Sequence, residues 1–198
     1  MRKRLALLLV PCLLLASAFA LSACGGSDSD SEGEIEDAIQ TSVTSTDPAK
    51  CTDLMTTTFI NQSSDLSGDA AVEECEEEAG DTSDDPDSVT VTEVEVDGAG
   101  ATAPVAFAGG VYDGQTIAVA LVEEDGDWKL DEITGFAKLD AEALATSVEE
   151  QFEKGGEISP AQISCIGDGI REAPQGEIEE LLFGGSSQPL VEFAEACE

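Results

Sequence analysis

Cysteine and histidine deserve the first look, because they supply many of the nucleophiles, general bases and metal ligands found in proteins. The chain of 198 residues has no histidine, so catalytic triads, histidine bases and histidine-ligated metal centres cannot be built. Its cysteines form no Cys-x-x-Cys pair, the spacing typical of structural zinc. We therefore expect no catalytic residue, no metal site and no cofactor, and we favour a protein that is not an enzyme. The six cysteines are Cys12, Cys24, Cys51, Cys75, Cys165 and Cys197.

The start of the chain has the composition of a secretory signal. Residues 2–4 are basic, residues 5–19 form an apolar run too short to span a bilayer, and small residues follow. This pattern predicts that residues 1–23 are a signal peptide. A membrane-spanning anchor and a freely secreted protein are the alternatives.

The segment Leu21, Ser22, Ala23 and Cys24, followed by two glycines, resembles the bacterial lipobox. The resemblance implies cleavage between Ala23 and Cys24, a diacylglyceryl group on the Cys24 thiol, and Cys24 as the mature N-terminus. Two buried acyl chains hold a protein on a bilayer far better than one, so this attachment should be essentially permanent. The resemblance therefore implies a lipoprotein on the extracytoplasmic face of the cell membrane, with the lipid bilayer as its first partner.

The mature chain is strongly acidic. Removing residues 1–23 leaves five basic and forty-three acidic residues, a formal net charge of −38. Nucleic acid is excluded as a partner, because binding it needs clusters of Lys and Arg that are absent here. The acidic surface either attracts cations or a basic partner, or is simply a solvated surface in a cation-rich cell wall.

Four cysteines remain once Cys12 leaves with the signal and Cys24 carries lipid. An even number outside the cytoplasm predicts two disulfides, for which three connectivities exist. We favour Cys51 with Cys75 and Cys165 with Cys197, because the members of each pair lie on the apolar sides of neighbouring predicted helices.

Residues 24–31 are predicted to be a flexible tether of mainly Gly, Ser and Asp. After it the apolar spacing predicts a helix capped by Ser31, a second helix from Asp47 to about Phe59, and a third over residues 69–78. The pattern then alternates with period two over residues 89–96, with a bulge near residues 92 and 93, and over residues 101–107, 115–123 and 127–133. Pro104 should lie at a sheet edge or at the bulge. The expected arrangement is a four-stranded antiparallel meander.

Helices followed by such a meander, closing on the acidic, Gly, Trp, Lys, apolar hairpin of residues 124–133, resemble the nuclear transport factor 2-like superfamily. The likeness covers residues 32–138. It implies a cone-shaped α+β domain with a cavity between helix and sheet, used by some relatives for isomerase or dehydratase chemistry and by others for binding. A carboxylate base in that cavity, with Tyr112 as oxyanion donor, is the enzymatic alternative, although Tyr112 and Trp128 are more typical of rim and core residues.

Residues 139–198 are predicted to form a second, small helical unit, similar to disulfide-bonded helical domains of actinobacterial exported proteins. Asp140 should cap its first helix, which Gly155 and Gly156 end, and Ser159 with Gln162 should form a capping box for the next. Apolar spacing predicts two further helices, near residues 178–182 and 190–197. The fold class is therefore α+β: helices on a curved four-stranded antiparallel sheet, then a small all-α, disulfide-linked unit.

Two acidic segments have some features of cation sites. Residues 28–35 match the start of a calcium loop, but Ile39 stands where the bidentate carboxylate belongs. Residues 81–87 are more typical of a solvated acidic loop.

The leading functional hypothesis is a non-catalytic binding module. It would bind an extracytoplasmic protein or a small apolar ligand, in the cone cavity or between the units. The enzyme described above and a purely structural envelope protein are the alternatives.

Overall fold

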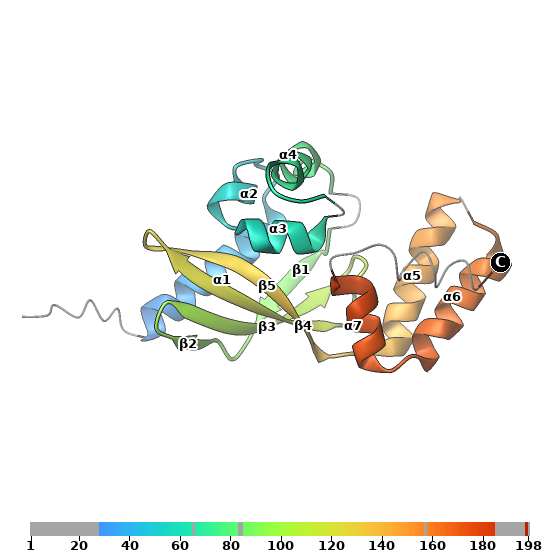
Figure 1. The fold of residues 1–198 in the computed structure, drawn as a ribbon. Helices are drawn as coiled ribbons and strands as arrows, with labels where there is room; N and C mark the ends of the chain where they lie inside the picture. Colours follow the sequence, from blue (N-terminus) through green and yellow to red (C-terminus); the bar gives the residue numbers. More distant parts are fainter. Residues whose placement is uncertain (1–27, 65, 83–84, 157, 185–196, 198) are drawn as a thin grey trace, which may run out of the picture.

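The computed structural model describes residues 28–64, 66–82, 85–156, 158–184 and 197, and it confirms the predicted α+β class. An open antiparallel sheet carries one long helix, a group of short helices and a C-terminal group of helices (Figure 1). None of the described helices is long and apolar enough to cross a membrane. The elements are α1 Asp28–Thr44, α2 Lys50–Asp53, α3 Thr57–Ser63, α4 Asp69–Glu78, β1 Ser88–Val91, β2 Glu95–Asp97, β3 Gly100–Ala108, β4 Thr116–Glu124, β5 Asp127–Lys138, α5 Ala141–Gly155, α6 Pro160–Glu172 and α7 Gln175–Phe183.

The predicted bulge splits the first strand of the meander in two. Strands β1 and β2 both pair with β3, in the sheet order β1-β3-β4-β5, and β1 and β2 follow one another along β3. Val91 pairs with Val105 and Glu95 with Thr102, so four steps on one strand oppose three on the other. The extra residue is accommodated by Glu93, whose φ of 51° is left-handed.

Pro104 lies in an interior strand, opposite this bulge, rather than at a sheet edge. The Thr92 N–H donates to the Pro104 carbonyl. The N and C=O of one residue point to the same side of an antiparallel strand, so the proline nitrogen also faces the bulge. The missing N–H of proline therefore costs the sheet little there.

Strand β5 is longer and more irregular than its sequence predicted, because it continues to Lys138 rather than ending at Ile133. Its pairing with β4 shifts register at three places, so its twelve residues oppose nine. Each extra residue breaks the alternation on which the prediction depended and bends the strand. The three shifts give the sheet its curvature.

The edge of β5 that does not pair with β4 is covered at three places, three residues apart. The backbone of Leu130 pairs with residues 54–56, with Leu130 N–H donating to the Leu54 carbonyl at 2.9 Å and Thr56 N–H donating to the Leu130 carbonyl at 2.8 Å. Ile133 pairs with the side-chain amide of Gln62, and Phe136 pairs with side chains of α7. An edge covered in this way is blocked against pairing with a strand of another molecule.

This edge pairing also corrects the predicted second helix. Instead of one helix from Asp47 to Phe59, the chain forms α2 and α3, separated by the segment that pairs with Leu130. Helix α2 begins at Lys50 with Ala49 as its N-cap and no side-chain cap, so Asp47 is not the helix cap; its carboxylate accepts from the Ala49 N–H at 3.0 Å in the turn before the helix. The helical spacing is present in the sequence, but hydrogen bonds to β5 compete successfully for this backbone.

Helix α1 packs its apolar face on the sheet, and Ile35 and Ile39 are almost completely buried. The helix begins at Asp28, so Ser31 lies inside it rather than capping it, and residues 28–31 are helical rather than part of a flexible tether. Acidic side chains in the first turns interact favourably with the partial positive charge of a helix N-terminus, which favours the earlier start. Helix α4 has the predicted bounds.

The C-terminal helices begin and end largely as predicted. Asp140 accepts from the Ala143 N–H, Gly156 ends α5 with a φ of 68°, and Ser159 forms the capping box of α6. Buried residues of these helices, such as Ile166 and Ile178, belong to the same hydrophobic cluster as the sheet. The helix predicted near residues 190–197 falls outside the described residues, apart from Cys197.

Candidate binding groove

The predicted site residues fall into two groups. Leu21, Ser22, Ala23 and Cys24 lie outside the described residues, so the lipobox stays a prediction. The structure brings both predicted cysteine pairs to disulfide distance, with Sγ atoms 2.02 Å apart for Cys51 and Cys75 and 2.08 Å apart for Cys165 and Cys197.

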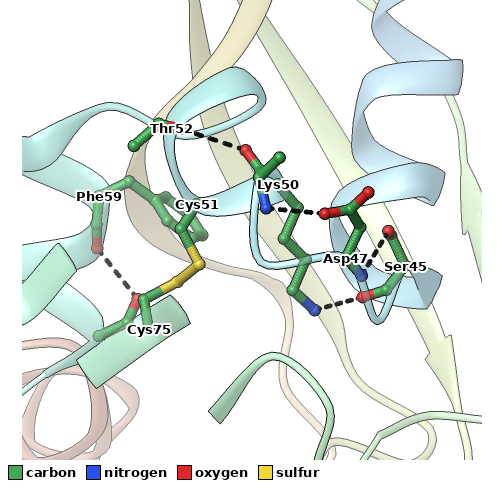
Figure 2. Close-up of a disulfide and its surroundings, with 9 residues drawn as sticks. Ser45, Asp47, Lys50, Cys51, Thr52, Phe59 and Cys75 are labelled. Carbon is green, nitrogen blue, oxygen red and sulfur yellow. Dashed lines mark hydrogen bonds between the residues drawn. A yellow bond between two sulfur atoms is a disulfide. The ribbon is translucent and has the colours of Figure 1, made fainter. Parts of the chain in front are cut away.

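The Cys51–Cys75 pair joins α2 to α4 (Figure 2). Cys51 is completely buried and forms a small hydrophobic cluster with Ile60 and Ala71, separate from the main core. The helices α2, α3 and α4 are too short to be stable alone, so they depend on packing in this cluster. The disulfide therefore fixes the walls of whatever lies between these helices.

A groove of about 400 Å³ lies between these helices. Ligand pockets in proteins commonly have volumes of about 300 to 1,000 Å³, so the groove is large enough for a small molecule. Its apolar lining comes from α3, from α4 and from the segment between α2 and α3, whereas α2 contributes Lys50. The apolar lining residues are Met55, Phe59, Ile60, Ala71, Cys75 and Ala79.

Helix α4 creates the hollow through its small side chains. Ala71, Cys75 and Ala79 follow one another at intervals of four and so lie on one face of the helix. A Leu or Ile at these positions would fill the space between α3 and α4. Glu74 and Glu78 share this face and line the groove as well. The same face of α4 thus provides an apolar wall and an acidic rim.

The acidic rim lacks a compensating positive charge. Glu74, Glu78 and Asp85 line the groove, and none of them forms a salt bridge with any described residue. Lys50 is the one basic residue of the lining, but its ammonium group donates to the Ser45 carbonyl at 2.6 Å (Figure 2). The groove therefore combines an apolar interior with net negative charge.

An exposed leucine lies in the loop between two of these helices, close in the chain to lining residues of the groove. Leu66, in the loop between α3 and α4, is 44% exposed and is the one large hydrophobic residue that is exposed in the described part of the chain. Its N–H donates to the hydroxyl of Ser64, and that hydroxyl in turn donates to the carboxylate of Glu74. Ser64 and Glu74 both line the groove. The backbone of Leu66 is thus linked to the groove through Ser64.

Two other hollows, of about 670 and 680 Å³, are larger but more polar. One lies between α1 and the hairpin that joins β4 to β5, and the other lies beside α5 and residues 109–113. Each is lined largely by carboxylates and other polar groups and has no continuous apolar wall. An acidic surface alone does not indicate a ligand, so the groove beside the disulfide is the better candidate.

The cavity expected between the helix and the sheet is filled by side chains where the structure describes it. Ile35 and Ile39 from α1 and Leu121 from β4 are almost fully buried there, and Trp128 is buried as predicted. Tyr112 packs against Phe107 and Phe183, with ring centroids 5.8 and 6.1 Å away, and its burial raises the pKa of its hydroxyl. Tyr112 lines none of the three hollows, so it is not placed beside a cavity carboxylate.

Within the described ranges, no group of three or more Cys, Asp or Glu side chains is arranged to hold a metal ion. Residues 28–39, which partly match a calcium loop, lie inside α1, and a helix cannot wrap its side chains around one ion as that loop does.

Sequence reasoning did not find the groove. The spacing of Ala71, Cys75 and Ala79 is a visible signal, but it predicts only a flat helix face. The hollow depends on the break between α2 and α3, which places Met55 and Phe59 opposite that face. No protein-family model, curated protein or solved structure matches the chain.

Proposed function

We propose that the chain is a lipoprotein held on the extracytoplasmic face of the membrane by Cys24, and that its folded part is a non-catalytic binding module. The observation that carries the binding proposal is the groove between α2, α3 and α4, with its apolar lining and its open acidic rim. The lipobox resemblance supports the anchor, and the two cysteine pairs at disulfide distance agree with an oxidising compartment.

The chemistry of the lining also supports a binding role. The lining offers carboxylates, hydroxyls and apolar groups, and the Ser64 hydroxyl donates a hydrogen bond to the Glu74 carboxylate. Apolar walls with a few polar groups at the mouth are typical of ligand recognition. The proposed ligand is a small molecule with an apolar part that enters between Phe59 and Ala79.

The anchor is tested by expressing the full chain in a bacterium that processes lipoproteins, next to a Cys24→Ser variant. The wild type should fractionate with membranes, and its N-terminal peptide should begin at residue 24 with the mass of a diacylglyceryl group. The variant should lack that mass. An unmodified Cys24 thiol in the exported wild-type protein would contradict the proposed anchor.

The binding role is tested with three water-soluble probes that share a benzyl group: benzyltrimethylammonium, benzyl alcohol and phenylmethanesulfonate. The full chain in phosphatidylcholine nanodiscs is titrated by calorimetry, with empty nanodiscs as the blank. At least one probe should bind, and Ala79→Leu, which fills the groove, should abolish its binding. Ala70→Leu is the matched control, because Ala70 is exposed on the same helix. Binding that survives Ala79→Leu, or no binding of any probe, would refute the proposal.

A further inference from the structure

We infer that the ligand of this groove is an amphipathic cation, a small molecule that joins an apolar body to a positively charged group. The inference rests on the binding function proposed above and specifies its ligand class. It follows from the combination of three features in one place: the apolar lining, the rim carboxylates without ion-pair partners, and the excess of carboxylates over the single lysine of the lining.

The charge argument begins with the rim. Glu74 and Glu78 lie one turn apart on α4, and both line the groove together with Asp85. Glu74 accepts a hydrogen bond from the Ser64 hydroxyl, which orients its carboxylate but leaves its charge uncompensated. Like charges gathered at one mouth raise the local concentration of cations, and apolar walls strengthen this field because they exclude water.

Lys50 is the internal cation that could have neutralised this rim. Figure 2 shows its side chain extending from α2 back to the loop after α1, where its ammonium group donates to the Ser45 carbonyl. The Asp47 carboxylate accepts from the Ala49 N–H, and the Asp47 N–H donates to the Ser45 hydroxyl, so this loop is organised by its own hydrogen bonds. Lys50 keeps its charge but forms no salt bridge with these carboxylates, so the lining stays net negative and a cationic ligand would be attracted to it.

The apolar lining residues indicate what the apolar part of the ligand would contact. Phe59 offers an aromatic ring among the lining residues, and aromatic faces attract quaternary ammonium groups as well as apolar groups. Met55 can adapt its side chain to irregular shapes. An inorganic cation would leave all of this surface unused.

The test compares the three benzyl probes on the wild-type chain and on two double variants. The rim variant Glu74→Gln with Glu78→Gln removes two charges from the groove. The control variant Glu73→Gln with Glu77→Gln removes two charges at the same spacing from exposed positions of α4 that do not line the groove. Circular dichroism verifies that both variants remain folded.

Benzyltrimethylammonium should bind more tightly than benzyl alcohol, and phenylmethanesulfonate should bind most weakly. The rim variant should weaken binding of the cation about tenfold, since a surface charge pair contributes up to about a factor of five and two are removed. It should leave the affinity for benzyl alcohol within about twofold. The control variant should leave all three affinities unchanged.

Equal affinity for the cation and the neutral probe, with both lost in Ala79→Leu, would overturn this inference while leaving the proposed binding function intact. An equal loss of cation binding in the control variant would also overturn it, because the attraction would then belong to the whole acidic surface. If no probe binds, both the inference and the proposed function fail.

Discussion

Replacing Gln62 should destabilise the protein more than a substitution at a partly exposed position usually does. Its side-chain amide accepts from the Ile133 N–H at 2.7 Å and donates to the carbonyls of Ile133 at 2.8 Å and Phe183 at 3.1 Å. One side chain thus joins α3, the edge of β5 and the end of α7. Gln62→Met keeps most of the volume but removes all three hydrogen bonds.

The expected loss follows from these three bonds. A hydrogen bond contributes about 1 kcal/mol net to stability, and an edge N–H or C=O left without a partner costs more when water cannot reach it. Gln62 is only half-buried, so water replaces part of what is lost. We expect Gln62→Met to lower the free energy of unfolding by about 2 to 3 kcal/mol.

Urea unfolding measured through the fluorescence of Trp128, the only tryptophan of the chain, reports this change directly. Gln40→Ala is the control, because Gln40 is exposed on α1 and should change stability by less than about 0.5 kcal/mol. Hydrogen exchange at the Ile133 amide should also accelerate in Gln62→Met. If that variant unfolds like the control and Ile133 keeps its protection, the interpretation of Gln62 as a cover for the strand edge is wrong.

Replacing Cys51 and Cys75 together by alanine opens a loop with a sequence separation of 24. The chain-entropy relation predicts that the free energy of unfolding, measured in urea, falls by about 3.5 kcal/mol. A fall of less than about 1 kcal/mol would contradict this prediction. Arg171 lowers the pKa of the Glu149 carboxyl, chiefly by a hydrogen bond and also by charge attraction. A carboxyl with a lowered folded-state pKa stabilises the fold above its unfolded-state pKa, and this contribution is lost as pH falls through the folded-state value. The stability difference between the wild type and Glu149→Gln should therefore be largest near neutral pH and shrink in acid, and a pH-independent difference in unfolding midpoints would argue against the ion pair.

The sequence predicted best where structure is local. Helix α4 and the caps at Asp140 and Ser159 depend on residues within one turn of each other, and the structure has them as expected. The bulge in the first strand was visible because the apolar residues change register there.

The sequence-based prediction failed where hydrogen bonds to distant backbone compete with local structure. Residues 54–56 have the spacing of a helix, yet they pair with Leu130, more than seventy residues away. The end of β5 was missed because three register shifts erase the alternation of its side chains. The groove depends on the same long-range pairing. Its lining forms only because the segment between α2 and α3 pairs with β5, and this pairing is not visible in the local sequence.

The most direct test of the central claim uses Met55. The chain has two methionines, Met1 and Met55, so removal of the proposed signal peptide leaves Met55, which lines the groove, as the single methionine. Protein labelled with ¹³C at the methionine methyl group should then give one resonance in nanodiscs. Addition of benzyltrimethylammonium should shift that resonance to saturation, with the same affinity as calorimetry gives, and the shift should weaken in the Glu74→Gln, Glu78→Gln variant. A Met55 resonance that does not move while the probe binds would place the ligand elsewhere and contradict the account.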